Sequence, residues 1–320
     1  MKMIKVDRRM LFLILWLGIL PCGIASAGNS SHLALFITGL SGNHATAVNF
    51  NKAAGDLRAV LLLNGYRQED LVRFADEKGL GNEKLWAVEK LATKVSLAKY
   101  LAELAQNGTV FENVFVFVSG HANGRDEEAM FHLPGDDMVY KELMAGIQNI
   151  PAKQMMVVVA ASQGISWIEN LSGPNRVVIV GNGLREFDSL PMLFLRTFSE
   201  LWRQFPVPES ERSEGPLKVS LRDVFVESQR QVLHWYRNNG LHTTEMAFMD
   251  ADGDKKGESF LRPEAMKKIF KDPGKTVVEA SPDPDAPEEK EEFPMDLTLP
   301  DAVRAGTMLF LTESGEETES

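Results

Sequence analysis

Apolar runs alternate with amphipathic stretches along the first two thirds of the chain. Several runs are continuous and rich in β-branched and aromatic residues, which predicts strands buried on both faces of a sheet. They span residues 32–40, 71–75, 114–118, 155–160 and 176–180. Between them, apolar residues recur at intervals of three and four, which predicts helices with one face packed on the sheet. These stretches cover residues 47–63, 96–105, 141–147 and 167–171.

This alternation of strands and helices predicts an α/β fold. Strands that are apolar throughout are typical of a mostly parallel sheet covered by helices on both faces, so we expect a three-layer α/β/α sandwich. In such sheets, ligands and catalytic groups gather where the strands end. The carboxyl ends of the strands are therefore the expected location of a functional site.

The last third of the chain combines helices with less regular segments. Helices are predicted over residues 190–202 and from Ser220 to Tyr236, where Ser220 with Asp223 resembles a capping box. The other segments are the loosened stretch 206–216, the proline-rich acidic linker 281–294, a candidate strand within 297–311 and the acidic tail 312–320. We expect one domain over residues 28–260 and an acidic, proline-rich, partly flexible extension over residues 261–320.

The first 27 residues have the composition of a secretory signal peptide. Basic residues precede an apolar run over residues 10–20, and Ala25-Ser26-Ala27 follows with small residues where a signal peptidase cleaves. The apolar run has about half the roughly 20 residues that a membrane-spanning helix needs. We therefore expect cleavage after Ala27, no stable membrane span afterwards, and an exported protein, either periplasmic or extracellular.

Cysteine content and charge narrow the function classes further. The single cysteine, Cys22, lies in the predicted signal peptide, so the mature chain would contain no thiol and no disulfide. The formal net charge is −11. Because nucleic-acid binding depends largely on lysine and arginine, we expect no nucleic-acid partner.

Two predicted strands end in residues that could carry chemistry. Ser119-Gly120-His121-Ala122 follows one strand, and Ala161-Ser162-Gln163-Gly164 follows the next. A histidine and a small hydroxyl residue at neighbouring strand ends form a nucleophile–base layout. The alternative is structural: His121 would be hydrogen-bonded in a turn, and Ser162 would cap a helix.

These strand ends, in this order, resemble those of the caspase–legumain clan of cysteine peptidases, and in particular the legumain-like proteins exported by some bacteria. In that clan one hydrophobic strand ends in His-Gly, and a later one ends in an Ala-Cys pair followed by small residues. The resemblance covers about residues 33–257. The segments that carry it are 33–62, 131–135, 149–159, 171–178 and 244–254.

The resemblance implies a caspase/hemoglobinase-like fold and assigns roles to three residues. His121 matches the general base of the family, Ser162 stands at or next to the place of the nucleophile, and Gly120 would direct a backbone N–H toward the oxyanion. A peptide or protein is the implied ligand.

The departures from the family pattern concern the catalytic chemistry itself. Ala122 replaces the glycine after the histidine, and a serine stands where a thiolate would attack. We therefore expect a catalytically degenerate homologue, retained for peptide or protein binding. The alternative is an active hydrolase with a Ser162–His121 dyad, which needs a third group to orient the base. The carboxylates near in sequence are Asp126, Asp136 and Asp188.

A run of alternating aspartates suggests calcium as the only candidate cofactor. Asp250, Asp252 and Asp254 are spaced like oxygen ligands of a calcium loop, but Lys255 and Leu261 occupy the positions where an EF-hand has glycine and glutamate. The sequence leaves open a polar turn, in which the carboxylates serve backbone geometry, and a weak calcium site. With a cation bound, a third function would be that of a calcium-stabilised interaction protein.

His132 and His234 are interpreted as structural residues. They lie on predicted ordered elements, and the sequence has no histidine–cysteine cluster with zinc spacing.

Overall fold

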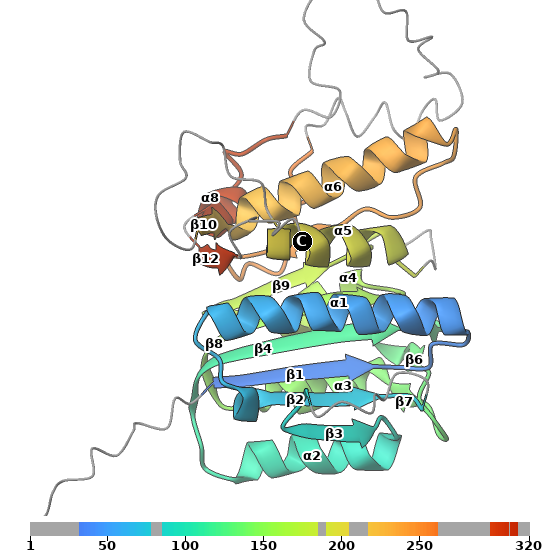
Figure 1. The fold of residues 1–320 in the computed structure, drawn as a ribbon, viewed down its shortest axis with the longest axis vertical. Helices are drawn as coiled ribbons and strands as arrows, with labels where there is room; N and C mark the ends of the chain where they lie inside the picture. The colour runs from blue at the N-terminus through green and yellow to red at the C-terminus, as the bar shows by residue number, and fades with distance from the viewer. Residues whose placement is uncertain are drawn as a thin grey trace, which may run out of the picture. The chain divides into compact units, whose positions relative to one another are not determined.

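A seven-stranded sheet in the order β11-β9-β8-β4-β1-β2-β3 forms the centre of the fold (Figure 1). Its strands are β1 (His32–Thr38), β2 (Leu71–Ala75), β3 (Val88–Leu91), β4 (Phe111–Gly120), β8 (Ala152–Ala161), β9 (Arg176–Val180) and β11 (Phe248–Asp250). All neighbours pair in parallel except β11, which runs antiparallel to β9. The mostly parallel sheet predicted from the apolar runs is confirmed.

The structure is a computed structural model, and it describes six stretches of the chain. They are residues 32–77, 85–184, 190–204, 217–261, 295–306 and 308–312. The predicted signal peptide, the stretch 206–216, the linker 281–294 and the residues after Thr312 lie outside them.

Helices cover the sheet on both faces, and each face has its own hydrophobic core. One core contains side chains of α1 (His44–Leu63), α5 (Met192–Gln204) and α6 (Leu221–Asn238). The other contains side chains of α2 (Lys94–Gln106), α3 (Tyr140–Gln148) and α4 (Ile165–Leu171). Successive strand residues alternate between the two cores, as Phe115 and Val116 of β4 do. This is the expected three-layer α/β/α sandwich.

Elements too short to produce a hydrophobic period are missing from the sequence prediction. They form a small antiparallel ribbon of β5 (Ala122–Asn123), β6 (Met130–Phe131) and β7 (Met138–Val139) that follows β4 directly. Edge strand β3 was also not predicted, because its sequence VEKL is half polar. The ribbon matters for function, since it begins immediately after His121.

The C-terminal part of the described chain adds a second small sheet. β10 (Leu217–Ser220) pairs antiparallel with β12 (Leu309–Thr312), the one strand found within or next to the candidate segment 297–311. A short helix, α8 (Pro300–Gly306), precedes β12 and contacts α6. Among the described helices, none is both long and apolar enough to cross a membrane.

Side-chain caps stabilise the first turns of α5 and α6. Ser220 caps α6 as predicted, with its Oγ accepting from the Asp223 N–H at 3.2 Å. Glu245, 5% exposed, caps α5 from a distant segment: its Oε2 accepts from the N–H groups of Leu193 and Phe194, each at 3.0 Å. Tyr236 donates to the other carboxylate oxygen at 3.2 Å. The chain after α6 is thereby fastened to the first turn of α5.

Burial gives this cap a pH-dependent stability. Burial raises the pKa of Glu245 from 4.5 to about 7, although the three hydrogen bonds act in the opposite direction. The folded state therefore binds a proton that the unfolded chain releases between these two values. The contribution of Glu245 to the stability of the folded state is therefore fully present below pH 4.5 and is lost as the pH rises through about 7.

We predict that Glu245→Gln removes this pH dependence, because the amide oxygen still accepts from the helix and the side chain stays neutral. Urea unfolding at pH 5 and pH 8 measures the effect. The free energy of unfolding of the variant, relative to that of the wild type, should be higher at pH 8 than at pH 5. Glu103→Gln, an exposed control on α2, should show no such change. Parallel pH curves for the wild type and Glu245→Gln would contradict the prediction.

Candidate functional site

The two predicted strand ends lie side by side at the carboxyl edge of the sheet. β4 and β8 pair in parallel, and Gly120 lies directly opposite Ala161. His121 and Ser162 are the next residues of the two strands, so the fold brings their backbones to neighbouring positions, as the sequence analysis expects. A contact between the two side chains stays a prediction.

Ser162 lies in a tightly constrained turn between β8 and α4. The residue is 2% exposed, and its carbonyl accepts from the buried Tyr140 hydroxyl at 2.7 Å. The next residue, Gln163, has a φ of 58°, which is unusual for a residue with a side chain. A Cβ on Gly164 would come within 2.4 Å of the Asn182 carbonyl oxygen. Backbone packing therefore fixes Ser162 in a nearly inaccessible position.

Gly120 occupies a position that only glycine fits. Its φ is +153°, and a Cβ there would lie 2.7 Å from the Phe131 ring and 3.2 Å from the Cα of Gly39. The ends of β1 and β4 thus approach each other and the ribbon closely. The proposed oxyanion contact of the Gly120 N–H stays a prediction.

A second histidine, His132, stands beside His121 with a carboxylate partner of its own. His132 donates its backbone N–H to the His121 carbonyl at 3.0 Å, and its Nδ1 lies 2.9 Å from Asp137 Oδ2. The other oxygen of Asp137 accepts from the Leu133 N–H at 3.2 Å. His132, which the sequence predicts to be a structural residue, is thus held by an acidic residue in the turn five positions later.

The three carboxylates that the sequence offers to orient a catalytic base lie in different surroundings. Asp136 is exposed, and Asp188 lies outside the described residues. Asp126 begins the short 3₁₀-helix η2 (Asp126–Glu128). Their neighbour Asp137 lies within hydrogen-bond distance of His132 Nδ1.

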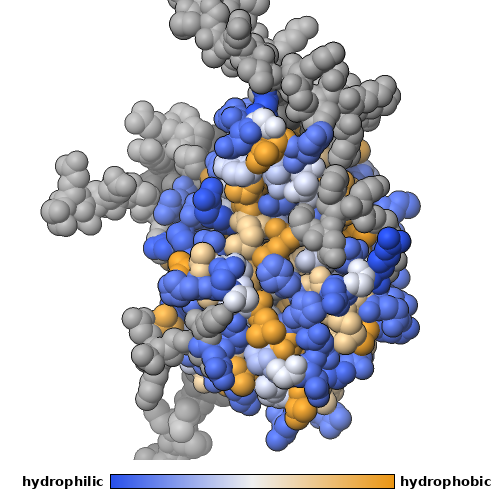
Figure 2. Space-filling model, turned by 90° about the vertical axis from the view of Figure 1, so that its right-hand side faces the viewer, coloured by the Kyte–Doolittle hydropathy of each residue, from blue (hydrophilic) through white to orange (hydrophobic). Residues whose placement is uncertain are grey.

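Hydrophobic residues gather on the face of the molecule where the parallel strands end. Figure 2 looks onto this edge and shows them as a band down the middle, bordered by hydrophilic residues. Leu40, which follows β1, is 38% exposed, and Val48 in the first turns of α1 is 48% exposed. The carboxyl edge therefore combines polar strand-end residues with accessible apolar surface.

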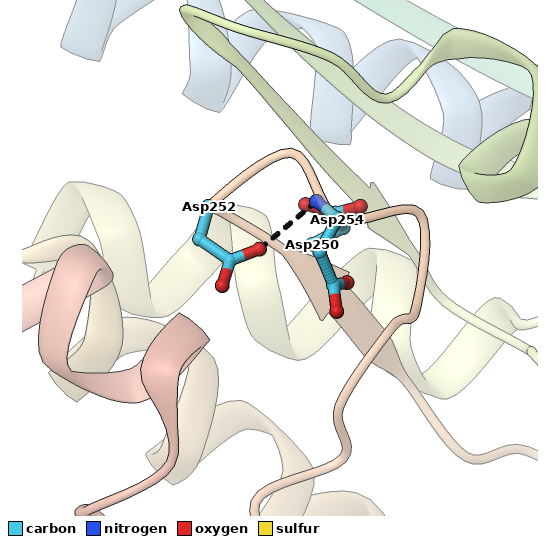
Figure 3. Close-up of side chains that lie close together, drawn as sticks. All are labelled: Asp250, Asp252 and Asp254. Carbon is cyan, nitrogen blue, oxygen red and sulfur yellow. Dashed lines mark hydrogen bonds between the residues drawn. The ribbon is translucent and has the colours of Figure 1, made fainter.

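The three predicted aspartates are brought together in one turn after β11 (Figure 3). One carboxylate oxygen of each lies within 4.8 Å of the others. Asp250 is buried and accepts from the N–H groups of Gly253 and Lys255, at 2.6 and 2.7 Å. Asp252 accepts from the Asp254 N–H at 3.0 Å. The carboxylates hold the turn together, and their spacing also suits oxygen coordination of a cation.

A further carboxylate, Asp301 of α8, adjoins this turn and was not predicted. It is 1% exposed and accepts from the N–H groups of Ala251 and Asp252, at 2.6 and 3.0 Å. Burial, with a smaller contribution from the charges of Asp250 and Glu258, raises its pKa from 3.8 to about 7. No local sequence pattern marks Asp301, because its partners lie about fifty residues away.

A cavity of about 710 Å³ lies at the opposite edge of the sheet. Its lining includes residues in the first halves of β4, β8 and β9, Trp202 of α5 and Arg304 of α8. It is distinct from the predicted site, because the strands begin there.

The sheet order and the two helical layers define the class as an α/β sandwich with a mostly parallel sheet. Similar solved structures include caspase-1 from Spodoptera frugiperda, at 10% identity over 69% of this chain and 86% of that one, with a TM-score of 0.42. The Drosophila initiator caspase Dronc matches at 10% identity over 71% and 82%, with a TM-score of 0.41. A protein of Geobacter sulfurreducens matches at 10% identity over 69% and 92%, with a TM-score of 0.40.

At TM-scores below 0.5 these similarities transfer no activity, and the fold class rests on the sheet topology itself. No protein-family model matches the chain, and no curated protein sequence does.

Proposed function

We propose that this protein is a catalytically degenerate homologue of legumain- and caspase-type peptidases that binds a peptide or protein ligand at the carboxyl edge of its sheet. The observation that carries the proposal is the burial of Ser162. A serine nucleophile must reach a substrate carbonyl and needs a base oriented by a third group. At 2% exposure, Ser162 is poorly placed to do so.

Ligand binding is supported by the surface around the strand ends. An apolar band with a hydrophilic border is typical of sites that bind other chains. Leu40 belongs to this surface and lies next to His132. Its side chain is 38% exposed, and its N–H donates to the His132 carbonyl at 2.8 Å. A ligand lying here would contact apolar side chains and the two histidines together.

One observation favours the active hydrolase as a second candidate. The pairing of Gly120 with Ala161 places His121 and Ser162 at adjacent strand ends. The two functions predict opposite results with a serine-directed probe, so one experiment separates them.

We predict that peptides selected against the protein from a displayed random library bind at the carboxyl edge and are recovered intact. Leu40→Glu should weaken their binding by about tenfold or more, since it places a charge in an apolar contact. Val110→Glu is the matched control, because Val110 is 54% exposed at the opposite edge, directly before β4. Titration calorimetry measures both affinities, and mass spectrometry checks the peptides for cleavage.

Two results would contradict the proposal. Equal loss of affinity in both variants would remove the carboxyl edge as the binding surface. Labelling of the wild type by a fluorophosphonate, absent in Ser162→Ala, would establish the hydrolase instead.

Export is part of the same proposal, and it is supported by the composition of residues 1–27. We predict that the protein recovered from the exported fraction begins at Gly28, as determined by N-terminal sequencing. Replacing the alanines of the Ala25-Ser26-Ala27 motif with bulky residues should leave a longer precursor. A native protein that retains Cys22 would contradict cleavage at this site.

Calcium stabilisation is a further candidate, favoured by the three carboxylates within 4.8 Å of one another. Asp301 and Glu258 are carboxylates beside the turn, and burial is the main reason that the pKa of each is raised. Repulsion from neighbouring carboxylates adds to the shift: from Asp252, Asp254 and Asp296 at Glu258, and from Asp250 and Glu258 at Asp301. A divalent cation would offset that repulsion.

We predict that millimolar CaCl₂ raises the melting temperature of the protein. The double variant Asp252→Asn, Asp254→Asn should lose this response, whereas Asp136→Asn, an exposed control outside the turn, should keep it. Scanning calorimetry with and without EDTA measures the shift. Absence of calcium binding at millimolar concentration would leave the carboxylates with their role in the turn alone.

A further inference from the structure

His121 and His132 occupy facing positions on the ribbon that follows β4. In this antiparallel pair, Ala122 lies opposite Phe131 and Asn123 lies opposite Met130. The same register places His121 opposite His132, and the 3.0 Å bond from the His132 N–H to the His121 carbonyl continues the ladder. Directly opposite residues project on the same face, with Cβ atoms about 5 Å apart.

Burial along the ribbon confirms which face carries the histidines. Ala122 and Phe131 are buried, at 7% and 0% exposure. His121 and His132, which alternate with them, are both partly exposed. The register therefore puts the two histidines at adjacent positions on the accessible face of the ribbon, while Ala122 and Phe131 on the other face anchor the ribbon to the core.

Asp137 fixes the orientation of one of these rings. Its Oδ2 lies 2.9 Å from Nδ1 of His132, and its Oδ1 is held by the Leu133 N–H. A carboxylate on Nδ1 places the proton there and leaves Nε2 as a lone-pair donor. This is the arrangement of histidines that ligate metals, where the carboxylate sets the tautomer and raises the basicity of the ligand.

We propose that His121 and His132 form a two-histidine binding site for a divalent transition-metal ion, with Asp137 as the positioning residue of His132. Imidazole nitrogens suit Zn²⁺, Ni²⁺ and Cu²⁺ and disfavour Ca²⁺ and Mg²⁺, which take oxygen ligands. Each imidazole supplies one ring nitrogen. Two protein ligands leave coordination positions open, so the bound ion can take a further ligand from solution.

The site is separate from the aspartate turn, and although its histidines border the proposed peptide surface, the ion needs no peptide to bind. It uses nitrogen donors on the ribbon, whereas the turn offers only oxygen donors from Asp250, Asp252 and Asp254. Metal binding is measured without peptide, so failure of one proposal leaves the other intact.

The test is titration calorimetry of the chain, without a polyhistidine tag, with NiCl₂ and ZnCl₂. We expect one ion per chain. His121→Gln and His132→Gln should each weaken binding by at least about tenfold, and Asp137→Asn by about tenfold through loss of ring orientation. His242→Gln, which changes an exposed histidine after α6, is the matched control and should bind as the wild type does.

Two further readouts separate metal ligation from a structural effect. The melting temperature of each variant without metal shows whether it is folded; glutamine keeps a polar side chain where alanine would leave a gap. Affinity should be lower in acidic than in neutral solution, because protons compete with the metal ion for the imidazole nitrogens. The electron paramagnetic resonance spectrum of bound Cu²⁺ should show nitrogen ligands and lose them in the folded double variant.

The proposal is overturned if the wild type binds no nickel or zinc at millimolar concentration. It is equally overturned if folded His121→Gln or His132→Gln binds the ion as tightly as His242→Gln does.

Discussion

The parallel pairing of β4 with β8 is the constraint on which the rest of the structure depends. These two strands occupy the middle of the sheet, and both are apolar on both faces, so each contributes to the two cores at once. A shift of one residue would turn every side chain of a strand toward the other core. The register is therefore fixed by packing along the whole strand. Its effect at the carboxyl edge is to place Gly120 opposite Ala161, and with them the residues that define the candidate site.

Close backbone approach at the same edge explains why the strand ends are tightly packed and Ser162 is nearly inaccessible. Gly120 and Gly39 allow the Phe131 ring to lie against the strand ends, and Phe131 anchors the ribbon that carries the histidines. The turn at Ser162 is held by Tyr140 from α3. The same packing that positions these residues restricts access to the Ser162 hydroxyl, which is why binding is a better supported function than nucleophilic attack.

The parts of this fold that are predictable from sequence are those with a long hydrophobic period. The strands at residues 71–75 and 176–180 have the predicted bounds, and the other predicted strands and helices are found with ends shifted by a few residues. The ribbon has strands of two residues, which are too short for any period, and β3 is half polar. Contacts between residues far apart in the chain also leave no pattern in the sequence. Glu245 caps α5 across about fifty residues, and Asp301 accepts hydrogen bonds from the aspartate turn across a similar separation. The strand-end motifs predicted where a site would lie, whereas the carboxylate partner of His132 depends on turn geometry.

The pairing of β10 with β12 has a consequence for the order in which the protein folds. Leu217 lies opposite Thr312, so 95 residues separate the two partners along the chain, from 217 to 312. Closing so long a loop costs conformational entropy that only the completed contacts repay, and the parallel strand pairs of the central sheet involve smaller separations, from 16 residues between Val72 and Val88 to 81 between His32 and Asn113. The small sheet should thus be among the last parts to assemble, after the sandwich has provided α1, α5 and α6 as the surface on which it docks. Until then the apolar faces of these helices stay partly open to solvent, so a chain that lacks this sheet exposes more aggregation-prone surface than the native protein does.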